Sequence, residues 1–282
     1  MLELWILYAL ISGIFVSLRE MYIKRYIRQS PEIISFTTRF YGSFIFIIFA
    51  LQGNIKITNI PVFIGITAVT VIITAFATLI RLHMIKTEEL SLTTPWLGLV
   101  PMFIVLWSIL LYREFPAGTA LIGIILVCIG GFIINLQGGR IEIKRASLWM
   151  LLTALMLGLT TTLDKLAIGA SSAITYSLIW TITSTVFMYG IAKRKNKKVM
   201  LLDKHLMMQA VLWVGEFLFQ MLAVQSISTI SSGQTYVKTL TMLNIVVTTV
   251  VSSLIFQEGN RRKRIFSACM IFLGAVLVIL FR

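Results

Sequence analysis

Hydrophobic residues dominate this chain in long runs that short polar stretches interrupt. A transmembrane helix needs about 20 mostly apolar residues, and ten runs reach roughly that length. The polar stretches between them leave no room for a soluble domain. The pattern therefore predicts an all-α membrane protein with ten transmembrane helices, the first of them retained as a helix. The ten runs are residues 2–22, 32–51, 61–81, 90–112, 117–136, 147–168, 173–192, 206–228, 233–256 and 265–281.

Composition and charge agree with a membrane location. Of the 282 residues, 58% are hydrophobic and 13% charged, whereas soluble domains carry about 25% charged residues. The net charge of +14 is distributed unevenly, because 18 of the 25 lysines and arginines follow the odd-numbered runs and four lie on the other side. Positively charged loops stay in the cytoplasm. We therefore expect a multi-pass protein of the cell (inner) membrane with both termini outside, whose basic run 193–198 contacts anionic lipid and binds no nucleic acid.

The chain also repeats itself. A shift of 144 residues places Trp5 on Trp149, Glu20 on Asp164, Glu114 on Glu258 and Gly130 on Gly274. Such matches at one offset indicate an internal duplication. Each copy, residues 1–138 and 145–282, holds five apolar runs, and an odd number inverts the second copy in the membrane. Inverted repeats are a transporter architecture in which the substrate lies where the copies meet.

Several motifs resemble those of a known family. The segment SPEIISFTTRF (residues 30–40) and the segment GLVPMFIVLWSILLYRE (residues 98–114) resemble the second-helix and fourth-helix motifs of the drug/metabolite transporter superfamily, EamA-like family. Gly123 and Gly130 follow at that family's fifth-helix spacing. In the second copy Gly274 is kept, while Ile245 and Ser267 replace an expected proline and glycine.

The resemblance implies ten helices in a 5 + 5 inverted repeat. It also implies transport of small metabolites, often amino acids and commonly outward. Members of the family usually keep both termini in the cytoplasm, whereas the charge distribution of this chain places them outside.

Polar side chains recur on one face of several predicted helices, since positions three, four and seven apart share a face. Such stripes occur in the first, third, sixth, eighth and ninth runs, and the ninth continues to Thr248 and Ser252. Small polar residues also occur at ordinary helix contacts in membranes. We expect the substrate site to include Glu216, Lys238, Trp213, Gln220, Gln234, Thr241, Thr70, Thr74, Tyr8 and Trp96.

Glu216 is the strongest candidate. A carboxylate in the middle of an apolar helix is costly in lipid, so it is expected to face a cavity or a partner. With Lys238 on the next helix, Glu216 would suit a zwitterion, the carboxylate binding the amino group and the ammonium binding the carboxylate. Glu216 could instead carry a coupling proton, because burial disfavours a charged carboxylate.

Four further charged residues are expected to act as gate or structural elements: Glu20, Asp164, Arg39 and Arg81. For the two acids we expect pairing with Arg19, Lys24 or Lys165. Trp5, Trp149 and Trp180 lie near the ends of their segments or could serve as anchors at the membrane surface.

Other functions remain open at this stage. An organic-cation carrier would need Glu216 and aromatic neighbours alone, and a carrier of phosphorylated sugars would use Lys238, Arg81 and Arg39, although a buried Glu216 opposes an anion. A non-transporting scaffold is a further alternative. The sequence contains no metal-ligand motif and no nucleophile–base pair, so we expect no metal, no cofactor and no enzyme activity. The expected partners are a small-molecule substrate, the lipid bilayer and a coupling proton.

Overall fold

The computed structural model consists of helices and describes residues 3–51, 55–88, 94–134, 145–195, 203–230, 232–247 and 261–281. Within those residues lie ten α-helices with defined bounds and one 3-10 helix, and no β-strand occurs among them. The elements are α1 (Leu4–Tyr26), α2 (Pro31–Leu51), α3 (Ile60–Thr87), η1 (Thr94–Leu99), α5 (Val100–Tyr112), α6 (Gly118–Ile134), α7 (Arg145–Gly169), α8 (Ala173–Arg194), α9 (Lys204–Ser226), α10 (Gly233–Thr241) and α12 (Arg261–Phe281).

Helix length and composition support the membrane prediction. Among the described helices α1, α2, α3, α7, α8 and α9 are long and apolar enough to cross a bilayer. Three shorter apolar segments lie in α5, α6 and α12. The prediction of an all-α membrane protein is confirmed for the part of the chain that the structure describes.

The ninth predicted helix, residues 233–256, is wrong as a single continuous element. Helix α10 ends at Thr241. The Met242 amide is shared between the Lys238 and Thr239 carbonyls, and the Leu243 amide bonds to the Leu240 carbonyl, three residues back. Helical geometry resumes over residues 244–247, and residues 248–256, including Thr248 and Ser252, lie outside the described part. A shift of 144 residues places this break on the junction between η1 and α5, where Pro101 follows. Proline explains only the first break, since Ile245 stands at the corresponding position.

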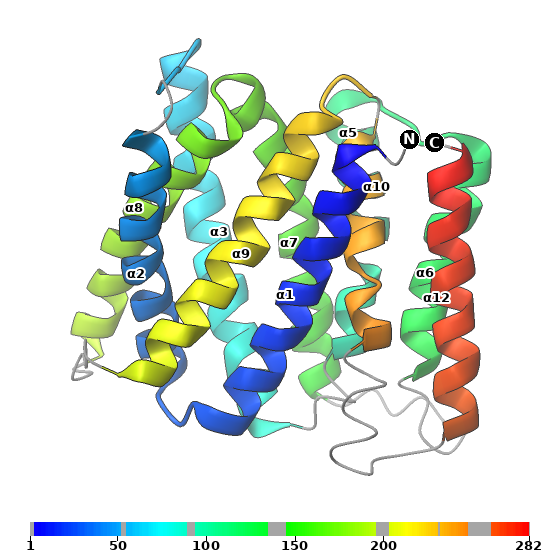
Figure 1. Ribbon diagram of the computed structural model, residues 1–282, viewed down its shortest axis with the longest axis horizontal. Helices are drawn as coiled ribbons and strands as arrows, with labels where there is room; N and C mark the ends of the chain where they lie inside the picture. Colours follow the sequence, from blue (N-terminus) through cyan, green and yellow to red (C-terminus); the bar gives the residue numbers. More distant parts are fainter. Residues whose placement is uncertain are drawn as a thin grey trace.

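Helix packing follows the internal repeat. Helices α1 and α9 pack together, as do α3 and α7, and the 144-residue shift exchanges these two pairs. The same shift maps the α2–α8 pair and the α6–α12 pair onto themselves. In the last pair Gly123 lies against Gly274, and Gly130 lies against Ser267, so the helices run in opposite directions (Figure 1). The two halves are therefore arranged about a twofold relation.

Figure 1 also shows how the ends of the helices are distributed. Helix α1 begins and α12 ends at one end of the bundle. The basic C-terminal turns of α1, α3 and α8 lie together at the opposite end, with the starts of α9 and α12. We call this second end the basic end.

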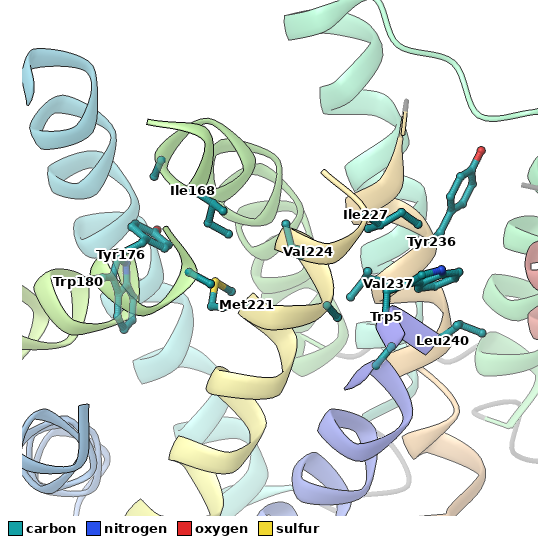
Figure 2. Close-up of a cluster of buried hydrophobic side chains, with 14 of the residues drawn as sticks. Trp5, Ile168, Tyr176, Trp180, Met221, Val224, Ile227, Tyr236, Val237 and Leu240 are labelled. Atoms are coloured by element: carbon teal, nitrogen blue, oxygen red, sulfur yellow. The ribbon is translucent and has the colours of Figure 1, made fainter. Parts of the chain in front are cut away.

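The largest apolar cluster holds the two halves together at the other end of the bundle. Trp5 of α1 packs near Val237 and Leu240 of α10, while Tyr176 and Trp180 project from one side of α8 toward Met221 of α9 (Figure 2). Between membrane helices such contacts stabilise the bundle by van der Waals packing, because lipid tails are as apolar as these side chains. This cluster ends where polar side chains begin, and those surround a cavity.

Candidate functional site

A cavity of about 120 Å³ with several charged lining residues lies inside the bundle. Side chains from α1, α2 and α3 line it on one side, and side chains from α7, α8, α9 and α10 line it on the other. It therefore lies where the two halves meet. Its ionisable lining residues are Arg19, Glu20, Arg39, Arg81, Asp164, Glu216 and Lys238.

Glu216 forms an ion pair across the two halves. Its carboxylate lies 2.6 Å from the Arg19 guanidinium, with side-chain exposures of 12% and 8%. About two turns earlier on α1, the Ser12 hydroxyl donates to the Glu216 carbonyl at 3.0 Å. Close approach of α1 and α9 explains the pair, since Phe15 lies directly against Gly215, where a Cβ atom would be 2.6 Å from the ring. Glu216 is thus neutralised by the protein itself.

Glu20 is paired as well, but with another partner than expected. Its carboxylate bonds to the Arg81 guanidinium of α3, rather than to Arg19 or Lys24. The two ion pairs lie beside each other. Residues of both, Glu20, Arg81 and Glu216, line a second cavity of about 30 Å³ together with Lys238. Buried pairs of this kind are strongly destabilised when one partner is removed.

Arg39 lies in the cavity wall without a carboxylate partner. Its guanidinium donates to the Ser35 carbonyl at 3.0 Å and to the Thr78 hydroxyl at 3.3 Å, and lies 5.6 Å from the Trp180 ring centroid. Its Nε has no hydrogen-bond partner, and no carboxylate of the described residues is within ion-pairing distance. The residue is only 3% exposed. A buried cation without a counter-charge is costly.

Aromatic rings form one wall of the cavity. Trp213 stacks on Phe217 with ring centroids 5.1 Å apart, and Trp180 lies at the same distance from Phe217. Gly42 of α2 makes room for this stack, because a Cβ atom there would lie 2.7 Å from the Trp213 ring. The prediction that Trp180 anchors the protein at the membrane surface is wrong, since Trp180 is 4% exposed and lines the cavity.

Asp164 is hydrogen-bonded rather than ion-paired. It accepts from the Tyr176 hydroxyl, and that hydroxyl also bonds to Thr70 at 3.2 Å. Lys165, a predicted partner of the acids, instead pairs with Glu114 at 2.6 Å. Lys238 points into the same cavity, where its ammonium donates to Gln220 at 3.3 Å.

The two halves also contact each other on either side of the cavity. Away from the basic end, Glu114 binds Lys165 and also accepts from the Ser232 amide at 3.0 Å. At the basic end, Tyr22 bonds to His205 at 2.7 Å beside an apolar cluster that includes Ile23, Ile34, Leu82 and Ile85, which also line the cavity.

The structure brings together part of the predicted site. The cavity is lined by Glu216, Lys238, Trp213, Gln220 and Thr74, and by all four residues expected to be gate or structural elements. The other predicted binding residues do not line it. Gln234 donates to Ser108, Thr241 to the Val237 carbonyl, Thr70 bonds to Tyr176, Tyr8 packs on Phe219, and Trp96 packs in an apolar cluster with Met150.

Several lining residues were not singled out from the sequence. Arg19, Thr160 and Gln209 belong to the polar stripes of the first, sixth and eighth runs, so the stripe pattern could have identified them as lining residues. Thr38 bonds to Gln209, and Ser35 and Trp180 carry no pattern that distinguishes them from packing residues.

Comparisons with known proteins agree with this architecture. The model of the EamA-like transporter family matches residues 3–136 and again 144–280. No curated protein matches the chain. One solved crystal structure, described only as that of a protein, shares the fold with a TM-score of 0.68 and 12% identity, over 98% of this chain and 96% of the other. Since the family match covers nearly the whole chain, the chain belongs to the EamA-like transporter family and is consistent with the drug/metabolite transporter superfamily.

Proposed function

We propose that this protein is a secondary transporter of a small metabolite that bears a carboxylate, amino-acid-like in character, and that it works by alternating access. The observation that carries the proposal is the cavity with charged lining residues between the two halves of an apolar bundle. Transporters built from repeats hold substrate at that place. A cavity of about 120 Å³ suits a small metabolite better than a drug-sized ligand, which takes about 300–1,000 Å³.

The charges of the cavity support a substrate with an anionic end. Four lining residues are cations and three are acids, and two of the acids are already paired with Arg19 and Arg81. Arg39 and Lys238 have only neutral hydrogen-bond partners within the described residues. A carboxylate between these two cations would supply the missing counter-charge. In this proposal Glu216 holds Arg19 in place, and no longer serves as the first contact for an amino group.

An organic-cation cargo and a scaffold role fit these contacts less well than the proposal, whereas a fully anionic metabolite fits them equally well. An organic cation would meet an excess of positive charge, and Arg39 already lies over the Trp180 ring. A fully anionic metabolite gains support, because the Arg19–Glu216 pair removes the main objection to it. A scaffold without transport would have no use for an unpaired buried guanidinium.

The membrane orientation is a separate part of the proposal. We propose inverted repeats over residues 1–138 and 145–282 in the cell membrane, with the basic end in the cytoplasm and both termini outside. The opposite directions of α6 and α12 and the gathered basic turns support it (Figure 1). Reporter fusions at the two termini are expected to show both outside, and a cytoplasmic signal from either would contradict this orientation.

The substrate class is tested by a ligand screen on the purified protein. Amino acids and small carboxylic acids are expected to raise the melting temperature in detergent, because they neutralise Arg39 and Lys238. Choline and simple amines of matched size are the control and are expected to give no shift. Compounds that bind are then tested for counterflow in proteoliposomes. Stabilisation by choline alone would overturn the carboxylate proposal, and binding without counterflow would favour a scaffold.

A further inference from the structure

Asp164 differs from every other acid of the cavity. Glu20 and Glu216 are neutralised by arginines, whereas Asp164 makes no ion pair with any described residue. It is nevertheless buried, with only 8% of its surface exposed, and it lines the cavity. A buried carboxylate without a cation is stable mainly in its neutral, protonated form.

The internal repeat explains why Asp164 has no cation. The shift of 144 residues places Asp164 on Glu20 and Gln225 on Arg81. In the first half, Arg81 neutralises Glu20. In the second half, Gln225 stands in the place of the arginine, and its side-chain oxygen accepts from the Ala173 amide at 2.8 Å. The duplicated ion pair is therefore kept in one half and lost in the other.

A hydroxyl chain satisfies Asp164 whether or not it carries a proton. When the carboxylate is charged, Tyr176 donates to it. When it is protonated, its new O–H can donate to the Tyr176 oxygen, and the Tyr176 hydroxyl can turn to Thr70, 3.2 Å away. Thr70 in turn donates to the Thr67 carbonyl at 3.1 Å. Hydroxyl groups both donate and accept, so the chain reverses without movement of heavy atoms.

The chain joins the two halves of the protein. Asp164 and Tyr176 belong to α7 and α8, while Thr70 belongs to α3 of the first half. The other charged groups that share the cavity with Asp164 are Arg19 and Glu20 of α1, Arg39 of α2, Arg81 of α3, Glu216 of α9 and Lys238 of α10. Tyr112 of α5 lies nearby and donates to the Thr162 carbonyl. None of them forms an ion pair with it. A proton on Asp164 thus changes a contact between halves that must move relative to each other.

We infer that Asp164 is a proton-binding site, and that the proton it takes up is the one coupled to substrate movement. The coupling rests on the proposed transport function, whereas the protonation does not. The proton adds to a carboxylate oxygen of Asp164 and leaves from it, and no other bond changes. Glu216, which the sequence offered as an alternative proton carrier, is instead paired with Arg19.

Infrared pH-difference spectra of the protein in lipid vesicles test the protonation without any substrate. The wild type is expected to show the carbonyl band of a buried carboxylic acid, which titrates with pH. Asp164→Asn is expected to lose this band. The double variant Arg19→Gln with Glu216→Gln, the matched control that changes the same cavity without leaving an unpaired charge, is expected to keep it. Tyr176→Phe keeps the acid and is expected to move the band, because the acid O–H loses the oxygen to which it donates. A wild type without the band, or loss of the band in the double variant but not in Asp164→Asn, would overturn the inference.

The coupling is tested separately in proteoliposomes with a mixture of radiolabelled amino acids as the probe. An imposed pH gradient is expected to accelerate wild-type uptake above the counterflow rate. Net uptake that does not respond to the gradient, in vesicles that show counterflow, would overturn the coupling while leaving the transport function in place. Absence of counterflow for every compound would overturn the transport function and leave the infrared result standing.

Discussion

Replacing Glu216 with glutamine is expected to destabilise the protein by about 3–5 kcal/mol, the usual effect of removing one partner from a buried ion pair. The Arg19 side chain, which is only 8% exposed, would then be a buried cation without its carboxylate partner. Its cavity already contains Arg39, Arg81 and Lys238, so repulsion adds to the loss of the partner.

Removal of the cation is expected to cost less than removal of the acid. In Arg19→Gln, Glu216 still shares its cavities with Arg81 and Lys238, which can neutralise it in part. The double variant Arg19→Gln with Glu216→Gln leaves no unpaired charge from this pair, and is expected to be more stable than Glu216→Gln alone. If both Arg19→Gln and the double variant are more stable than Glu216→Gln, the cavity holds an excess of positive charge.

Unfolding titrations in mixed micelles, followed by tryptophan fluorescence, measure these differences. Lys195→Gln is the control, because the Lys195–Glu32 pair lies at the basic end with a lysine side chain that is 56% exposed. That variant is expected to lose at most about 1 kcal/mol. Equal losses for Glu216→Gln and Lys195→Gln would show that the buried pair does not support the fold.

The sequence identified Glu216 but not its partner. An acid in the middle of an apolar helix is costly wherever it lies, so Glu216 could be recognised without a structure. Its partner Arg19 lies in the other half of the chain and belongs to a helix whose polar face is also its packing face. Only the way α1 packs on α9 determines which cation reaches the acid.

Helix continuity and aromatic placement were harder to predict. The apolar run 233–256 contains no proline or glycine after residue 233, so nothing local indicates that α10 ends at Thr241. The break depends on contacts of the folded protein, such as the Ser17 hydroxyl that donates to the Asn244 carbonyl at 3.0 Å. Trp180 follows the same logic, because only the packing of α8 against α9 turns it into the cavity. Apolar patterns locate the helices along the sequence. Contacts with distant segments determine where a helix is interrupted and which of its side chains line the cavity.

Replacing Arg39 with methionine is expected to abolish or strongly weaken substrate binding while leaving the protein as stable as before or more stable. Hydrogen bonds to a charged partner contribute about 1.5–3 kcal/mol, so affinity for a carboxylate should fall roughly tenfold to hundredfold. The guanidinium has no carboxylate in the described structure, so its removal relieves a buried charge rather than breaking an ion pair. Methionine keeps an apolar stem against Trp180.

Arg81→Met is the matched control, because it removes a cation of the same cavity that is paired with Glu20. Melting temperatures in detergent, measured with and without an amino acid that stabilises the wild type, separate the two roles. Arg39→Met is expected to melt at or above the wild-type temperature and to lose the ligand-induced shift, whereas Arg81→Met is expected to melt lower even without ligand. A structural Arg39 would behave like Arg81, with a lower melting temperature and a ligand shift that persists. Arg39→Met raises the melting temperature and removes ligand binding together only if the guanidinium serves to bind substrate. Binding residues of this kind lower the stability of the protein without ligand.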